Sequence, residues 1–161
     1  MSAGGPVQDD RRGPGLRFPP PLLAILLIGA AWLIHRYLPL PLVDEGQLRL
    51  PGYGLIVVAL ILIAVAFVQF RRAQTHIEPW QPTTHIIESG IFRYSRNPIY
   101  LAFCLATLGA GLVMNSWWGV LAPAPLAWLL QRLVIRKEEI YLEAKFGEAY
   151  LAYRNRVRRW F

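Results

Sequence analysis

Four long apolar runs divide this chain and restrict it to folds that a membrane can accommodate. They cover residues 22–38, 53–70, 99–114 and 117–135. A helix needs about 20 mainly apolar residues to cross a bilayer, with a range of about 17–25. Charged residues make up only 17% of the chain, whereas a soluble domain carries about 25%. We therefore predict an all-α integral membrane protein with four transmembrane helices.

Prolines and short polar breaks set the boundaries of these helices. Pro19–Pro21 precede the first run, which suits a helix start. Only Asn115–Ser116 separate the last two runs, so these two helices should form a tight antiparallel hairpin. Pro123 and Pro125 should kink the fourth helix.

The distribution of basic residues orients the predicted bundle. With the N-terminus inside, only Arg36 and Arg49 of the 17 lysines and arginines lie on the outer side. Such an excess is typical of cytoplasmic segments, so both termini should be cytosolic, at the inner membrane if the source is a bacterium. Residues 1–20 are expected to form a disordered tail and residues 21–161 a single membrane domain. Because this orientation accounts for the net charge of +7, we expect no nucleic-acid partner.

The segment 137–158 is predicted to be an amphipathic helix on the cytosolic membrane surface rather than a fifth span. Aromatic and apolar residues recur through it with charges between them, and it could break at Gly147. The basic residues near its end would face anionic lipid head groups, and these are Arg154, Arg156, Arg158 and Arg159.

A dense polar cluster lies immediately before the third apolar run. It is the sequence Arg-Tyr-Ser-Arg-Asn-Pro-Ile-Tyr at residues 93–100. Polar groups at a membrane boundary are costly, which suggests a functional reason for them. Arg96 can clamp a carboxylate with two parallel hydrogen bonds, and the rings of Tyr94 and Tyr100 can face a flat base or a cation. The alternative interpretation is a set of orienting arginines beside a capped helix start.

A second cluster, Arg136–Glu139, follows the fourth run. Acidic residues scarcely affect membrane orientation, so Glu138 and Glu139 need another explanation. We expect one of them to pair with Arg93 or with a basic neighbour in the same cluster, leaving the other free for an ammonium group or ribose hydroxyls. The alternative is a solvated start of the surface helix. Because the two clusters flank one hairpin, we predict that they meet on the same side of the bilayer.

No metal site is predicted. The chain has no CxxC or HExxH motif, and His35, His76 and His85 are widely scattered.

Two segments resemble a family of membrane enzymes. Residues 71–100, which end in Ser-Gly-Ile-Phe-Arg-Tyr-Ser-Arg-Asn-Pro-Ile-Tyr, are similar to the core of the isoprenylcysteine carboxyl methyltransferase and phospholipid methyltransferase superfamily. So are Glu138–Glu139 and the run Phe-Gly-Glu-Ala-Tyr-Leu-Ala-Tyr at residues 146–153. The resemblance covers residues 53–157 and implies an integral-membrane methyltransferase that uses S-adenosylmethionine.

The resemblance also implies a cofactor pocket that faces the cytosol. Its lining residues would be Arg93, Tyr94, Arg96, Asn97, Pro98, Tyr100, Glu138, Glu139, Tyr150 and His85, with His76 as a further member of its roof. Glu139 and Arg154 are the candidate catalytic residues, as contacts for the polar head of the acceptor. Two departures stand out, because many relatives have histidine in place of Asn97 and a proline soon after Val157.

The expected reaction is methyl transfer to a hydrophobic or lipid-like acceptor that enters sideways from the bilayer. The favoured acceptor is an isoprenylcysteine carboxylate, and a phospholipid amine is the alternative. Two further hypotheses are a non-catalytic membrane protein that retains the pocket and a purely structural four-helix protein. The acceptor's identity and the oligomeric state stay open at this point.

Overall fold

The computed structural model describes residues 19–43, 46–73 and 85–161, and within these ranges every regular element is helical. The elements are α1 (Pro20–Tyr37), α2 (Arg49–Arg72), the 3-10 turn η1 (Gly90–Arg93), α3 (Pro98–Val113), α4 (Trp117–Leu121), α5 (Pro123–Leu130), the π-helical turn η2 (Gln131–Ile135), α6 (Arg136–Phe146) and α7 (Glu148–Arg156). The predicted all-α class is confirmed for these residues. The predicted disordered tail and His76 lie outside them, apart from the last two residues of the tail.

Three helical segments within the described ranges are long and apolar enough to cross a membrane: α1, α2 and the stretch Trp117–Phe146. The fourth predicted span, α3, is apolar but has 16 residues. At about 1.5 Å per residue it is about 24 Å long, shorter than the roughly 30 Å hydrocarbon core. Three of the four predicted spans therefore have the length and composition to cross a membrane, while α3 is a shorter apolar helix. Exposed leucine, isoleucine and valine side chains cover much of α1 and α2, as expected for lipid-facing helices.

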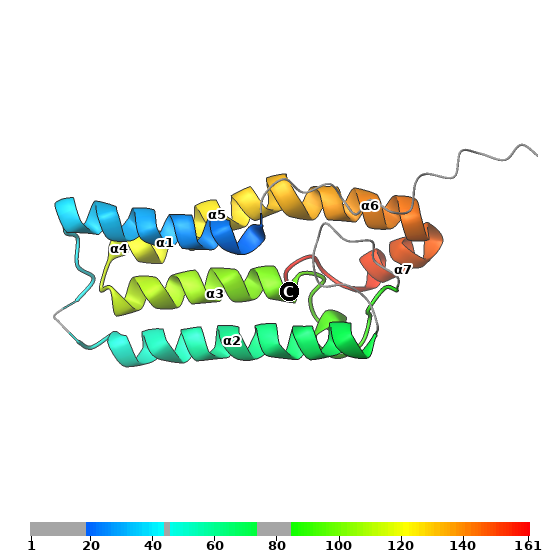
Figure 1. Ribbon diagram of the computed structural model, residues 1–161, viewed down its shortest axis with the longest axis horizontal. Coiled ribbons are helices and arrows are strands. Elements are labelled where there is room, and N and C mark those ends of the chain that lie inside the picture. The colour runs from blue at the N-terminus through cyan, green and yellow to red at the C-terminus, as the bar shows by residue number, and fades with distance from the viewer. Residues whose placement is uncertain (1–18, 44–45, 74–84) are drawn as a thin grey trace, which may run out of the picture.

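Helix α3 lies at the centre of the bundle, between α1 and α2 (Figure 1). The buried residues of α2 are Gly52, Ala59 and Ala66, which lie seven residues apart and so form one stripe. A Cβ atom at Gly52 would lie 2.8 Å from the carbonyl oxygen of Gly109 in α3. The two backbones can approach this closely only because both positions lack a side chain.

The end of the bundle away from α7 is fastened by the short connection between α3 and α4. Asn115 there has a positive φ of 49°, a conformation that asparagine tolerates better than most residues. Its side-chain oxygen accepts hydrogen bonds from the backbone N–H groups of Leu42 and Val43, both at 3.2 Å, and its side-chain nitrogen donates to the carbonyl of Val43 at 2.7 Å. The predicted polar break is thus a turn that also holds the segment after α1.

The last apolar segment differs from its predicted form. The helical path is interrupted at Ala122, directly before Pro123, but it then continues through Ile135 into α6 and stops only at Phe146. Gly147 then adopts a positive φ of 52°, and α7 turns back toward the start of α3 (Figure 1). The predicted surface helix 137–158 is therefore divided into α6 and α7. The division lies at Gly147, where the sequence suggested a break.

Candidate functional site

The turn before α3 is anchored to two other helices. Phe92 of η1 packs edge-on against Phe70 of α2, with ring centroids 5.5 Å apart. The hydroxyl of Tyr153 in α7 donates a hydrogen bond to the carbonyl oxygen of Phe92 at 2.8 Å. Burial raises the pKa of Tyr153, which keeps the phenol protonated and able to donate. The turn and α7 are therefore locked together.

The residues that follow lead directly into α3. The backbone N–H of Asn97 donates to the hydroxyl of Ser95 at 3.1 Å, and both side chains are buried. Pro98 is the first residue of α3 and is also buried. Its missing N–H costs no helical hydrogen bond at this position. Arg96 is thus held on a defined backbone at the start of the helix.

The two adjacent glutamates of α6 reach the start of α3 in different ways. Neighbouring residues on a helix point about 100° apart, so the two carboxylates meet different partners. Glu138 accepts a hydrogen bond from the hydroxyl of Tyr100 at 2.5 Å. Glu139 forms an ion pair with Arg96 at 3.3 Å. The π-helical turn η2 lies directly before α6, and such turns are frequent at functional sites.

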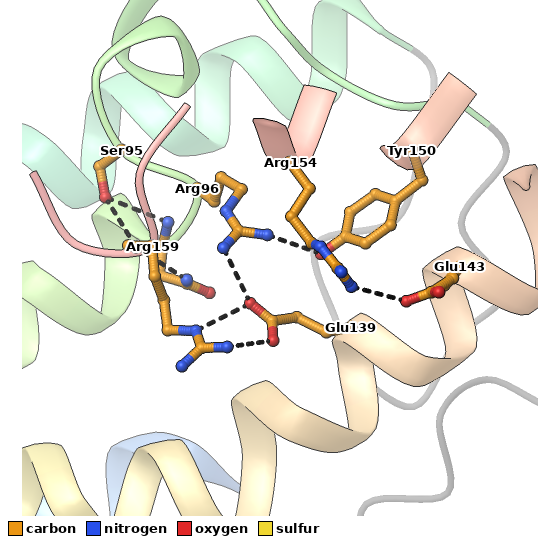
Figure 2. A network of polar contacts seen from close by, with 8 residues as sticks. Ser95, Arg96, Glu139, Glu143, Tyr150, Arg154 and Arg159 are labelled. Carbon is orange, nitrogen blue, oxygen red and sulfur yellow. Dashed lines mark hydrogen bonds and ion pairs between the residues drawn. The ribbon is translucent and has the colours of Figure 1, made fainter. Parts of the chain in front are cut away.

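A buried polar network surrounds Arg96 (Figure 2). One terminal nitrogen of its guanidinium contacts Glu139, and the other donates to the hydroxyl of Tyr150 at 3.4 Å. The side chains of Arg96 and Glu139 are only 9% and 13% exposed. Burial raises the pKa of Tyr150, so its hydroxyl also stays protonated. Three helical elements, the start of α3, α6 and α7, therefore converge on one arginine.

Glu139 has a second cationic partner near the end of the chain. Arg159 donates to its two carboxylate oxygens, from Nε at 2.9 Å and from a terminal nitrogen at 2.6 Å. This is the bidentate geometry that guanidinium and carboxylate groups favour. The hydrogen bonds to Glu139 raise the pKa of Arg159.

These contacts correct the expected partners of the two glutamates. Within the described part of the chain, neither carboxylate is free, and neither pairs with Arg93 or with Arg136 and Lys137 of its own cluster. The reason is geometric, because α6 directs its acidic pair toward the start of α3 and the end of the chain, where other cations and a phenol already lie. The prediction that the two clusters meet is confirmed by the contacts of Glu138 and Glu139 with Tyr100 and Arg96.

Three other predicted cofactor residues lie outside this buried network. Tyr94 is 75% exposed, and Arg93 and His85 are exposed as well. Arg93 instead lines an open cavity of about 700 Å³ at the end of α2, together with residues 86–89, Ala73 and Arg156. Arg156 is paired there with Glu88.

The second candidate catalytic residue, Arg154, lies on the outer side of α7. It pairs with Glu143 of α6 at 2.8 Å, and the side chains of both residues are about 40% exposed. Figure 2 shows this pair beside the network, without a contact between Arg154 and Glu139.

The donors of the network fit a ligand with an anionic group. Two guanidinium groups face a single carboxylate, so the cluster of Arg96, Arg159 and Glu139 carries a surplus positive charge. The Nε atom of Arg96 is buried and has no hydrogen-bond partner among the described residues, and a buried N–H of this kind is costly unless something accepts from it. The carboxylate of a ligand is a suitable acceptor. Among the residues that the structure describes, no three His, Cys, Asp or Glu side chains gather as a metal site would require.

The residue of this network that sequence reasoning missed is Arg159. Its place in a run of basic residues predicts a side chain that faces lipid head groups, and the structure shows that this prediction is wrong. A contrary signal is present, because Arg159 is followed by Trp160, a large apolar residue that favours burial over solvent. Nothing in the sequence, however, indicates that the chain returns to the start of α3.

Comparisons with known proteins agree on a family. A family model described as phospholipid methyltransferase matches residues 48–149, which include Arg96, Glu138 and Glu139. The chain is 28% identical to the protein-S-isoprenylcysteine O-methyltransferase of Schizosaccharomyces pombe over 100 residues, which are 55% of this chain and 42% of the relative.

Two further relatives extend this result. The protein-S-isoprenylcysteine O-methyltransferase B of Arabidopsis thaliana is 27% identical over 108 residues, 66% of this chain and 55% of the relative. An uncharacterized protein of Haemophilus influenzae is 35% identical over 65 residues, 38% of this chain and 98% of the relative. The chain spans about half the length of the named methyltransferases that it matches.

Proposed function

The chain belongs to the phospholipid methyltransferase family, and from that premise we propose that it is an integral-membrane methyltransferase that uses S-adenosylmethionine. The observation that carries this proposal is the buried ion pair between Arg96 and Glu139, 3.3 Å apart. It joins the two polar segments on which the family resemblance depends, and it leaves a buried N–H of Arg96 without a partner among the described residues.

The network would bind the cofactor and orient it. Arg96 would hold the methionine carboxylate, and Glu139 and Tyr150 already fix the guanidinium, so little side-chain freedom is lost on binding. The remaining candidate contacts for the cofactor are Tyr100, Glu138 and the exposed side chains of Arg93 and Tyr94. The bound cofactor supplies the activated methyl group, and the protein supplies orientation and exclusion of water.

The acceptor would be hydrophobic or lipid-like and would approach from the bilayer. The names of the relatives favour an isoprenylcysteine carboxylate, and the name of the family model favours a phospholipid amine as the alternative. A carboxylate acceptor needs no proton removed before it reacts, whereas a protonated amine does. Arg154 remains a candidate contact for the acceptor head group because its exposed side chain borders the network. We place this end of the bundle in the cytosol, and the excess of basic residues supports this placement.

Cofactor binding by purified variants tests the first half of the proposal. Isothermal titration with S-adenosylmethionine should give a measurable affinity for the wild type and none for Arg96→Ala or Glu139→Gln. Glu143→Gln is the matched control, because Glu143 lies one turn further along α6 and pairs with the exposed Arg154. Equal affinities in the wild type, Arg96→Ala and Glu139→Gln would count against the proposed site.

Product formation tests the second half. The protein in lipid vesicles would be incubated with a labelled methyl donor and either N-acetyl-S-farnesylcysteine or phosphatidylethanolamine. A base-labile methyl ester on the first substrate supports the carboxylate reaction, and a stable methylamine on the second supports the alternative. Binding without any transfer would favour a non-catalytic protein that retains the cofactor site.

A further inference from the structure

We propose that Arg159 belongs to the cofactor site, where with Arg96 it supplies the positive charge that selects a ligand bearing a carboxylate. This inference rests on the proposed function. It adds the segment 157–161 to a site that the family match, which ends at residue 149, does not cover.

The carboxylate of Glu139 is shared between the two arginines. Its carboxylate accepts two hydrogen bonds from Arg159 and contacts one terminal nitrogen of Arg96. A carboxylate offers about four lone-pair positions, so about three of them are already used. Glu139 therefore holds the two arginines in place, and little of it remains for the ammonium group of a ligand.

Hydrogen bonds attach the segment 157–161 to the turn before α3. The carbonyl of Arg158 accepts a hydrogen bond from the backbone N–H of Arg96 at 3.0 Å. The carbonyl of Arg159 accepts from the side-chain nitrogen of Asn97 at 2.9 Å and from the hydroxyl of Ser95 at 3.4 Å. The backbone that carries Arg159 is thus fastened to the same turn that carries Arg96. Asn97 gains a definite role here, since it fixes this segment.

Apolar packing on both sides of Arg159 strengthens the attachment. Val157 is 3% exposed and clusters with Tyr150 and Tyr153 of α7. Trp160 packs against the buried cluster that includes Tyr100. The side chain of Arg159 between these anchors is 34% exposed, so one edge of it stays accessible while the other binds Glu139. Such a side chain is ordered before any ligand arrives, unlike the exposed side chain of its neighbour Arg158.

The consequence concerns the ligand's charge. The two guanidinium groups share one carboxylate, that of Glu139, while the neighbouring carboxylate of Glu138 accepts a hydrogen bond from Tyr100. The local excess of positive charge on the two arginines is offset by an anion that binds beside them. Of the groups in S-adenosylmethionine, only the methionine carboxylate is anionic. We therefore expect Arg159 to contribute to binding through this carboxylate and not through the adenosine.

The experiment compares two ligands that differ by one group. Affinities for S-adenosylmethionine and for its decarboxylated analogue would be measured on the full-length protein in detergent. The proteins would be the wild type, Arg159→Gln, Arg159→Lys and the matched control Arg158→Gln, each first checked for thermal unfolding well above the temperature of the titration. We expect Arg159→Gln to weaken binding of S-adenosylmethionine about tenfold and binding of the analogue less than about twofold, because a charge-assisted interaction is lost only with the former. Arg158→Gln should match the wild type, and Arg159→Lys should recover part of the loss.

Each other outcome has a definite meaning. If Arg159→Gln weakens both ligands equally, Arg159 has only a structural role and the inference is overturned. It is also overturned if Arg159→Gln binds S-adenosylmethionine as tightly as the wild type does. A wild-type protein that binds neither ligand overturns the proposed function itself, and this inference with it.

Discussion

Replacement of Glu139 by glutamine should destabilise the protein much more than the same change at its neighbour Glu138. The two residues are adjacent on α6 and differ in their partners. Glu139 is the shared anionic partner of Arg96 and Arg159, whereas Glu138 accepts a hydrogen bond from the neutral hydroxyl of Tyr100. The amide of glutamine can still accept a hydrogen bond, but it cannot neutralise a guanidinium.

The expected magnitudes follow from these contacts. Removing one partner of a buried ion pair costs about 3–5 kcal/mol. The side chain of Arg159 is 34% exposed, and solvent screening reduces its share, which gives about 2–3 kcal/mol for Glu139→Gln. Glu138→Gln keeps an acceptor opposite Tyr100 and should cost less than about 1 kcal/mol. For a chain of this size, each kcal/mol lowers the unfolding temperature by about 2–4 °C.

The assay is thermal unfolding of the two variants and the wild type, in the same detergent and at the same heating rate. Glu139→Gln should unfold several degrees below Glu138→Gln. If Glu138→Gln loses as much stability as Glu139→Gln, or more, the claim that charge balance at Glu139 organises this end of the bundle is wrong.

Three further predictions concern other parts of the molecule. Gly52→Ala should destabilise the α2–α3 contact by about 1–3 kcal/mol through overpacking, whereas Gly54→Ala, whose added methyl would meet nothing within 4 Å among the described residues, should not; equal unfolding temperatures of the two variants would refute this. Tyr153→Phe should cost about 1–3 kcal/mol by leaving the Phe92 carbonyl unpaired. Because burial raises the pKa of Tyr153, its contribution to stability should be complete below about pH 10, the pKa of an exposed tyrosine, and be lost as the pH rises through the higher folded-state value. In an absorbance titration of the folded proteins, the tyrosine signal that is present in the wild type and absent from Tyr153→Phe should therefore appear only above about pH 10. A signal of this kind below that pH would contradict the prediction. Asn115→Ala should be more destabilising than Asn115→Gly, because both lose the hydrogen bonds to Leu42 and Val43 but only glycine tolerates the positive φ of 49°; unfolding temperatures in the reverse order would contradict this reason.

The helices are largely predictable because hydrophobic length is a strong signal. The predicted spans 22–38 and 53–70 correspond to α1 and α2, with ends that differ by up to four residues. The true boundaries of α2 include Arg49 and Arg72, which composition alone excludes although their long side chains can reach the membrane surface. The continuation of the last helix to Phe146 is missed because a change from apolar to charged residues does not by itself end a helix.

The sequence predicts which residues form the site better than it predicts which of them pair with one another. The density of polar residues at 93–100 and the acidic pair indicate Arg96, Tyr100, Glu138 and Glu139. Which cation meets which carboxylate depends on helix rotation and on the turn at Gly147, and neither can be read from spacing. For the same reason the sequence could not show that Arg159 returns to Glu139.

The unbroken path from η2 into α6 has a mechanical consequence. The stretch from Pro123, after the interruption at Ala122, to Phe146 is about 36 Å long at about 1.5 Å per residue, which exceeds the roughly 30 Å thickness of the hydrocarbon layer. The acidic pair of α6 therefore lies at one end of a helical path whose other part is apolar enough to lie in the membrane. Because bilayer thickness affects the tilt of a transmembrane helix, we expect lipid acyl chain length to affect the position of Glu139 relative to the start of α3.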